Sequence, residues 1–350
     1  MIDIEKYLGQ LRQTLSASYV SLLLDIAESR GIPAVQLLAN TDLNVNDLKD
    51  EKRIAIWQHC SVIFNLLKLT NEPSIAIEMG LRNSPVKSSI ISFGLMSCES
   101  LQDAIELGVR FLPIQFPYFD ASLKVDGDVA IIIIKDRVPF LIARRFILEN
   151  FLIRAAEVLI SLLFDQHVSD KYKKLSCELF FDYPEPDHFS AYKDRLPALS
   201  FNQAECQIRF SVEALSFTLP TANSEIKQII VKQGESELEK LNRTQEWVKR
   251  VSALLVIKDG QYPDLTSLSK KMNMSESSFK RKLAEGGANY TTLLNEVRLS
   301  DAKALLTQFE LRIEDISARL GFQDRASFTR AFQRWTSMSP TEYRRMLIKK

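Results

Sequence analysis

The stretch that decides the fold runs from residue 312 to residue 345 and reads RIEDISARLGFQDRASFTRAFQRWTSMSPTEYRR. Apolar residues recur at helical spacing in its first part, at Ile313, Ile316 and Leu320. Gly321 then supplies a tight turn, and Asp324 stands where its side chain can cap a second helix. The inner face of that second helix consists of Phe328, Ala331, Phe332 and Trp335. The stretch therefore predicts two short helices joined by a turn, a helix–turn–helix unit.

The end of the same stretch predicts one further helix. Ser339 and Glu342 stand three residues apart and form a capping box, with Pro340 at the first helical position. No typical capping side chain precedes Ile313, because Arg312 stands there.

The helix–turn–helix pattern occurs once before, 48 to 49 residues nearer the N-terminus. Asn273 takes the place of Gly321, and both residue types tolerate the left-handed backbone of a tight turn. Ser269 and Ser317 are the small residues at the position where the two helices of each unit must approach closely. The paired apolar positions are Leu268 and Ile316, Met272 and Leu320, Phe279 and Phe328, and Leu283 and Phe332.

A longer helix is predicted between the two units, over residues 290–306. At 1.5 Å per residue it would be ~25 Å long. With its turns it could hold two recognition helices about 34 Å apart, the length of one DNA repeat.

Charge is distributed unevenly along the chain. Residues 241–350 carry 20 Lys and Arg against 12 Asp and Glu, a net charge of +8, whereas residues 1–240 carry 25 against 32, a net charge of −7. An acidic body with a basic terminal domain is typical of a protein that carries a nucleic-acid-binding module. Charge alone also fits an all-helical core with solvated basic side chains, but a duplicated helix–turn–helix in the basic part favours double-stranded DNA as the partner.

The second helix of such a unit reads base edges in the major groove through its outward side chains. Arg281 and Arg330 occupy the same place in the repeat, and an arginine there can bind guanine through two hydrogen bonds or clamp a phosphate. Lys282 and Arg334 flank the two faces and suit phosphate contacts. The candidate DNA-binding residues are Ser277, Lys280, Arg281, Lys282, Arg325, Ala326, Thr329, Arg330 and Arg334.

The first part of the chain predicts an α+β domain over residues 1–222, which would sense an effector or mediate self-association. Helical patterns at residues 19–29 and 146–164 are interspersed with predicted strands at residues 123–125, 129–134, 175–183 and 207–212. The polar segment 223–243 is assigned to a linker, for which partial helix is left open, and residues 244–350 to the all-α domain with the two helix–turn–helix units.

No catalytic, cofactor or metal site is predicted, and we do not expect an enzyme. The histidines and cysteines lack metal-ligand spacing, and no phosphate loop or nucleophile elbow occurs. Aromatic residues at Phe111, Phe116, Tyr118 and Phe119 could line an effector pocket, although core packing is the more usual role. The effector-binding residues therefore remain unknown.

No stretch approaches the roughly 20 apolar residues of a membrane span, and the first residues lack the pattern of a signal peptide. The four cysteines are scattered without the spacing of a disulfide framework. We expect a reduced, cytoplasmic protein.

The second helix–turn–helix resembles that of the AraC/XylS family of transcription regulators. The matching features are Ile316, Leu320-Gly321-Phe322, Ser327-Phe328, Arg330-Ala331-Phe332, Arg334-Trp335 and Ser339-Pro340 with Tyr343-Arg344. The first unit resembles the more variable half of the family's DNA-binding domain, and the resemblance covers about 105 residues. The family usually has Ala where this chain has Ser317, and Gly where it has Asn273.

The N-terminal region resembles the "arabinose-binding" effector domain of one branch of that family. The matching features include Gly31-Ile32, Gly80-Leu81, Gly94-Leu95-Met96-Ser97 and the strand at residues 129–134. In that branch the name implies neither arabinose binding nor a cupin barrel.

The resemblance implies a transcription regulator, more commonly an activator, that binds promoter DNA, contacts RNA polymerase and responds to a small-molecule effector. Control by a protein partner, and an enzyme or ligand-binding protein with an appended DNA-binding module, remain alternatives. The effector, the operator and the choice between activator and repressor stay open. So does a homodimer, because no heptad seam of three or more repeats is visible.

Overall fold

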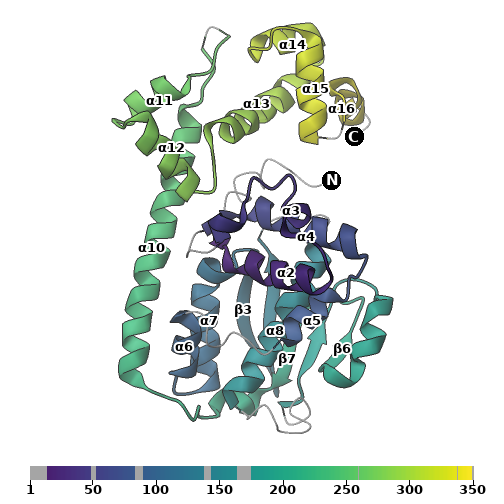
Figure 1. The fold of residues 1–350 in the computed structure, drawn as a ribbon, viewed down its shortest axis with the longest axis vertical. Helices are drawn as coiled ribbons and strands as arrows, with labels where there is room; N and C mark the ends of the chain where they lie inside the picture. Colours follow the sequence, from purple (N-terminus) through teal and green to yellow (C-terminus); the bar gives the residue numbers. More distant parts are fainter. Residues whose placement is uncertain are drawn as a thin grey trace. The chain divides into compact units, whose positions relative to one another are not determined.

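The computed structural model describes residues 14–48, 53–82, 90–137, 143–163, 175–258, 260–336 and 338–348. The contacts between its residues divide the chain into two compact units (Figure 1). The first unit is Thr14–Leu241, and the second extends over Asn242–Lys350.

A five-stranded sheet forms the centre of the first unit, with the strand order β3-β4-β7-β5-β6. All neighbouring strands are antiparallel except β5 and β6. A two-residue loop joins β3 to β4, and its first residue, Gly127, has a φ of 57° that favours glycine. The strands are β3 (Phe119–Asp126), β4 (Val129–Asp136), β5 (Glu178–Phe180), β6 (Ala198–Ser200) and β7 (Cys206–Ser211).

Helices and a small strand pair complete the first unit, which confirms the predicted α+β class (Figure 1). The predicted helix at residues 146–164 is α8 (Arg144–Leu163), which packs closely on α5. The other helices are α2 (Ser18–Ser29), α3 (Ala34–Leu37), α4 (Ile56–Thr70), α5 (Ile75–Leu81), α6 (Ile90–Met96) and α7 (Leu101–Gln115). The strand pair is β1 (Thr14–Ser16) with β2 (Arg53–Ala55), and single 3-10 segments cover Val45–Leu48, Asp187–Arg195 and Val212–Ser216.

The aromatic cluster of the sequence is core. Phe111, Tyr118 and Phe119 are fully buried, and Phe116 packs its ring against the ring of Phe151 at 5.1 Å. The cluster thus takes the core role.

One long helix, α10 (Ser224–Leu254), runs from the first unit into the second. It passes through the segment that the sequence analysis assigned to a linker. Its apolar stripe includes Ile230 in the first unit and Val251 in the second, both buried. The predicted domain limits at residues 222 and 244 stay predictions.

The second unit is all-helical, as predicted, and it holds two separate cores. Helix α13 (Tyr290–Leu306) has the predicted bounds and contributes to both cores. Its Leu293 lies in the first core with Trp247 and Val251 of α10, whereas Leu299 and Leu306 lie in the second. The remaining helices are α11 (Leu265–Lys271), α12 (Glu276–Glu285), α14 (Ile313–Arg319), α15 (Arg325–Thr336) and α16 (Pro340–Ile348).

Among the described residues, no helix is both long enough and apolar enough to span a membrane.

Candidate nucleic-acid interface

The first helix–turn–helix consists of α11 and α12, and a side chain caps the start of each helix. Asp264 accepts a hydrogen bond from the backbone amide of Ser267 at 2.8 Å, and Ser275 accepts one from the amide of Ser278 at 3.2 Å. Asn273 takes the left-handed conformation with a φ of 53°. These contacts satisfy amides at the two helix starts and set the turn between the helices.

The second helix–turn–helix, α14 with α15, repeats this construction. Asp324 accepts a hydrogen bond from the amide of Ser327 at 2.6 Å, and Gly321 has a φ of 72°. At the start of α14, the amide of Arg312 donates to the carboxylate of Asp315 at 3.3 Å, so an acid in the first turn satisfies the amide of the residue before the helix.

The turns of the two helix–turn–helix motifs share equivalent backbone hydrogen bonds. The amide of Met274 donates to the carbonyl of Ser269 at 2.9 Å, and the amide of Phe322 donates to the carbonyl of Ser317 at 3.1 Å. Both serines are buried, as the close approach of the helices requires. The sequence repeat is therefore a repeat of backbone geometry.

The two recognition helices, α12 and α15, expose most of the predicted DNA-binding side chains. Arg281 and Arg330, which are equivalent in the repeat, are both exposed. On α12 they are joined by exposed Ser277 and Lys280, and on α15 by exposed Arg325 and Ala326. Each helix thus turns one arginine-bearing face to solvent and its apolar face to a core.

Three of these arginines already have polar neighbours. Arg325 donates to Glu314 of α14 at 2.6 Å, and Arg330 donates to the hydroxyl of Ser327 at 3.1 Å. Arg281 lies 4.0 Å from Glu285 on its own helix. A hydrogen bond from its own backbone amide, followed by the contact with Arg325, lowers the pKa of Glu314. Glu314 is therefore ionised at neutral pH and holds Arg325 on the outer surface.

The remaining candidates are less exposed. Lys282 is half-buried, with its ammonium 4.9 Å from the centre of the Trp247 ring, a cation–π contact within its own unit. Thr329 is half-buried on α15. Arg334 lies in α15, but its side chain lies outside the described residues.

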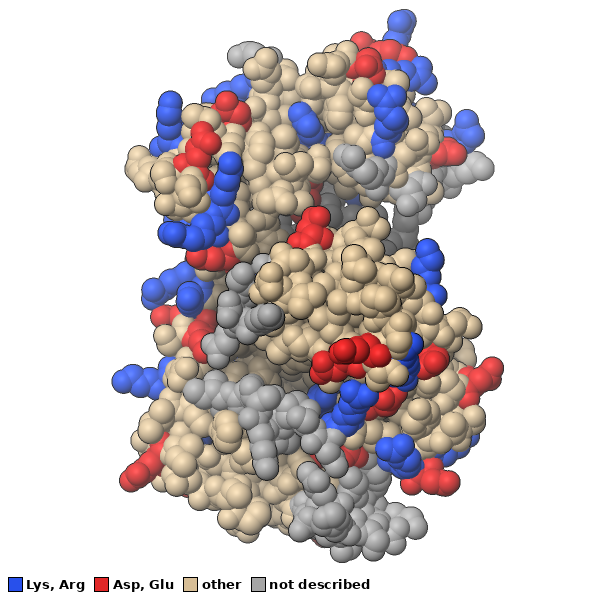
Figure 2. All heavy atoms as spheres, viewed as in Figure 1, with Lys and Arg blue, Asp and Glu red and all other residues tan. Residues whose placement is uncertain are grey.

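Basic side chains do not form one continuous patch on the face drawn in Figure 2. Lys and Arg side chains there stand among acidic and uncharged ones. The exposed arginines of the two recognition helices define the candidate interface.

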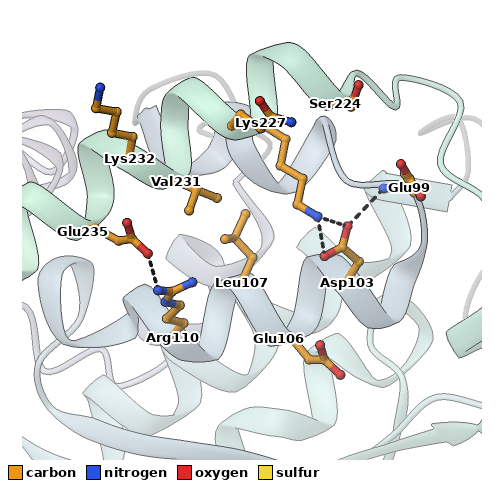
Figure 3. A pocket seen from close by; sticks show the side chains of 11 residues that line it. Glu99, Asp103, Glu106, Leu107, Arg110, Ser224, Lys227, Val231, Lys232 and Glu235 are labelled. Carbon is orange, nitrogen blue, oxygen red and sulfur yellow. Dashed lines mark hydrogen bonds and ion pairs between the residues drawn. The ribbon is translucent and has the colours of Figure 1, made fainter.

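A second surface feature lies wholly within the first unit, between α7 and the first part of α10 (Figure 3). It is an open groove of about 620 Å³ with side chains of both charges. Sequence reasoning missed it because the residues come from segments more than 120 positions apart. The lining residues are Glu99, Asp103, Glu106, Leu107, Arg110, Ser224, Lys227, Gln228, Val231, Lys232 and Glu235.

Two ion pairs cross this groove. The ammonium of Lys227 lies 2.6 Å from one carboxylate oxygen of Asp103 and 2.7 Å from the other, and Arg110 pairs with Glu235 (Figure 3). Partial burial opposes ionisation of Asp103, but the hydrogen bond from Lys227 outweighs it and lowers the pKa of that carboxyl. The same bond raises the pKa of Lys227.

Glycines let α10 approach its neighbours beside the groove. A β-carbon on Gly234 would lie 2.8 Å from the ring of Phe111 on α7, and one on Gly94 would lie 2.8 Å from Ile230. These distances are too short for real contacts, so both positions require a residue without a side chain.

No group of three or more His, Cys, Asp or Glu side chains placed to hold a metal ion occurs in the described segments. Sequence reasoning also missed Glu314, which pairs with Arg325 at 2.6 Å.

Two family models match the chain, and each matches one of its parts. The model described as "Helix-turn-helix domain" matches residues 268–346. The model described as "Arabinose-binding domain of AraC transcription regulator, N-term" matches residues 31–219.

Individual relatives match along almost the whole chain. An uncharacterised HTH-type transcriptional regulator of Mycobacterium tuberculosis is 24% identical over 342 residues, which cover 96% of this chain and 97% of the relative. The ornithine utilization regulator of Pseudomonas aeruginosa is 24% identical over 334 residues, 95% of this chain and 96% of the relative. The crystal structure of the transcriptional regulator CdpR from Pseudomonas aeruginosa aligns with a TM-score of 0.44 and 21% identity, and the alignment covers 93% of this chain and 98% of that one.

The arabinose-binding model spans more than half of the chain, and the helix–turn–helix model covers both repeated units. The chain therefore belongs to the family of AraC transcription regulators, with an arabinose-binding-type domain followed by a helix–turn–helix DNA-binding domain.

Proposed function

We propose that the chain binds promoter DNA sequence-specifically through α12 and α15, with each helix in a major groove. The observation that carries this proposal is the equivalence of Arg281 and Arg330, two exposed arginines on capped helices that repeat one backbone geometry. A single chain would then bind two major grooves on one side of the duplex. Because α12 and α15 expose different side chains around their arginines, the operator should be asymmetric.

Within this interface, Arg281 and Arg330 read base edges, with Ser277, Lys280, Arg325, Ala326 and Thr329 around them. Lys282 and Arg334 are assigned to phosphates. Phosphate contacts orient the protein on the duplex, whereas base contacts give the specificity.

The effector of the first unit acts, in this proposal, at the groove between α7 and α10. A small molecule that carries both an ammonium and a carboxylate suits it, because acids and bases line it together. The name of the ornithine utilization regulator supports the same chemical class. Since α10 continues into the second unit, a ligand that competes with the Lys227–Asp103 pair would act on the helix that enters the DNA-binding part.

Activation through contact with RNA polymerase is the regulatory outcome that we propose, in line with the family resemblance. We propose the cytoplasm as the site of this regulation, since the DNA target would be met there. A homodimer on DNA is the assembly to test, by light scattering of the protein–DNA complex.

The experiment for DNA binding is a gel-shift titration of the full chain against its own upstream DNA and a shuffled control, at two salt concentrations. Preference for the upstream DNA that persists at the higher salt supports the proposal. Equal binding to both DNAs that weakens with salt would show a nonspecific basic module instead.

The experiment for the effector repeats the titration with L-ornithine, L-arginine or L-glutamate and adds a thermal-shift measurement. Arg110→Gln alters the groove, and Arg195→Gln is the matched control, an exposed arginine beside an aromatic ring elsewhere in the first unit. An effect of one probe that Arg110→Gln abolishes and Arg195→Gln preserves supports the site. If no small molecule changes DNA binding while a protein captured from the same cells does, the alternative of protein control is favoured.

A further inference from the structure

The second unit contains a joint between its two helix–turn–helix halves, made of residues that belong to neither recognition helix. On one side lies the turn at Gly260, beside which the amides of Lys258 and Gln261 each donate to the carbonyl of the other at 2.9 Å. On the other side lies the turn between α14 and α15. A β-carbon on Gly321 of that turn would lie only 2.7 Å from the carbonyl oxygen of Gly260, so the two turns are in backbone contact.

Arg298 of α13 lies beneath this contact. Its guanidinium carbon is 5.3 Å from the centre of the Tyr262 ring and 5.0 Å from the centre of the Phe322 ring. Tyr262 belongs to the loop before α11, whereas Phe322 packs in the second core. One cation therefore bridges a ring from each half of the DNA-binding unit.

Two further contacts tie Tyr262 to α13 and Phe322 to α15. Tyr262 donates a hydrogen bond to Asp301 at 2.7 Å, one helical turn beyond Arg298. Phe322 lies against Phe328 at 5.5 Å between ring centres, and Phe328 is a fully buried residue of recognition helix α15. The joint thus connects the loop of one half to the recognition helix of the other.

The hydrogen bonding of the Nε atom of Arg298 is unusual for a buried polar atom. Among the described residues, its buried Nε has no hydrogen-bond partner. Buried polar atoms are normally paired, so the contacts with the two rings are the prominent ones of this side chain.

We propose that Arg298 is a positioning residue that fixes the spacing of the two recognition helices and thereby the half-site spacing that the chain accepts. The proposal rests on the proposed function, in which α12 and α15 enter two grooves. Helix α13 sets the distance between the halves, and the Tyr262–Arg298–Phe322 stack prevents them from tilting about it.

The test starts from an operator selected from random DNA with the full wild-type chain. Binding is then measured to that operator, to versions whose half-sites are moved one or two base pairs closer or farther apart, and to each half-site alone. The variants are Arg298→Met, which keeps the stem without the cation, and Arg298→Lys, which keeps the charge without the planar group. Arg250→Met is the matched control, an exposed arginine of the same unit outside the joint.

We expect the wild type and Arg250→Met to favour the selected spacing. In Arg298→Met, the ratio of the affinity for the selected spacing to that for an altered spacing should fall about tenfold, because two cation–π contacts are lost. In Arg298→Lys the ratio should fall less. Binding to single half-sites should not change.

Three outcomes would overturn the inference. Unchanged spacing preference in folded Arg298→Lys and Arg298→Met chains would show that the stack does not set the spacing. An equal loss on all DNAs, single half-sites included, would make Arg298 a phosphate contact. If the wild type binds one half-site only, the two-groove proposal itself fails, and this inference fails with it.

Discussion

The carbonyl oxygen of Gly260 occupies the space that a β-carbon on Gly321 would need, 2.7 Å away. Gly321 also has a φ of 72°, a conformation that side chains other than glycine rarely adopt. Two features therefore restrict position 321 to glycine: the conformation of its own backbone, and the loop that precedes the first helix–turn–helix.

Replacement of Gly321 by alanine should therefore destabilise the second unit beyond the ordinary cost of a left-handed alanine. That ordinary cost is about 1 kcal/mol. Gly260→Ala measures it directly, because Gly260 has a φ of 76° and open space at its β-carbon. Chemical denaturation of both variants gives the comparison. Equal losses in the two variants would mean that the contact between the turns relaxes without cost.

Removal of the arginines on the recognition helices should weaken specific binding. We expect Arg330→Ala and Arg281→Ala each to cost roughly 1–3 kcal/mol on the selected operator and little on shuffled DNA. Competition titrations with both DNAs measure the two effects, and Arg250→Ala serves as the control. A loss of the same size on both DNAs would assign the arginine to a phosphate.

Lys282 should contribute to the salt dependence of binding. Lys282→Met keeps the aliphatic stem near Trp247 but removes the charge, so the slope of log affinity against log salt should fall by about one unit. Thermal melting of the free protein controls for the lost contact with the ring. A slope equal to that of the wild type would indicate that the ammonium remains on Trp247 in the complex.

The contact of α10 with α7 should depend on the absence of a side chain at Gly234. Alanine in a helix is normally more favourable than glycine by about 1 kcal/mol. Gly234→Ala should nevertheless destabilise the first unit by ~1–3 kcal/mol, because the new methyl meets the Phe111 ring.

Gly108→Ala on α7 is the matched control for Gly234→Ala. The nearest atom to its β-carbon is 3.6 Å away, so this substitution should be stabilising. Opposite signs for the two variants in urea denaturation are the expected result, and a stabilising Gly234→Ala would contradict the close contact.

The Asp103–Lys227 ion pair should give the first unit a defined pH dependence. The pKa of Asp103 is lowered and that of Lys227 is raised, so the pair stabilises the fold above the unfolded pKa of the acid and below that of the base. Its contribution of about 0.5–1 kcal/mol should be complete between about pH 5 and 9 and should disappear as the pH falls through the lowered pKa of Asp103.

Asp103→Asn tests this pH dependence when unfolding is measured from pH 2 to pH 8. The difference from the wild type should be largest near neutral pH and should vanish in acid. A difference that does not change with pH would mean that the amide loses packing or hydrogen bonds and not the charge interaction.

The local features of the DNA-binding unit could be predicted from sequence because each depends on neighbours in the chain. The caps at Asp264, Ser275 and Asp324 each bind an amide three residues away. The bounds of α13 follow from its continuous apolar pattern, and the left-handed turn at Asn273 follows from its residue type.

The groove and the joint could not be predicted in this way. Lys227 and Asp103 are 124 positions apart, so only the folded chain brings them together. The segment around Gly234 is polar and contains glycine, which is typical of a linker, yet the glycine serves to let a helix reach Phe111. Arg298 has an ordinary helical setting in sequence, and its role depends on two rings that lie 36 and 24 positions away.

Helix α13 contributes to the core of each helix–turn–helix half. The number of its residues therefore also sets the angle by which one half is rotated relative to the other about the helix axis. Each residue of an α-helix advances about 1.5 Å and turns about 100°. Insertion of one residue after Arg298 would therefore rotate α15 about the axis of α13 by about 100°. It would lengthen the helix by only about 1.5 Å. In the proposed complex with DNA, the number of residues in this one helix therefore sets the angle at which the second recognition helix follows the first.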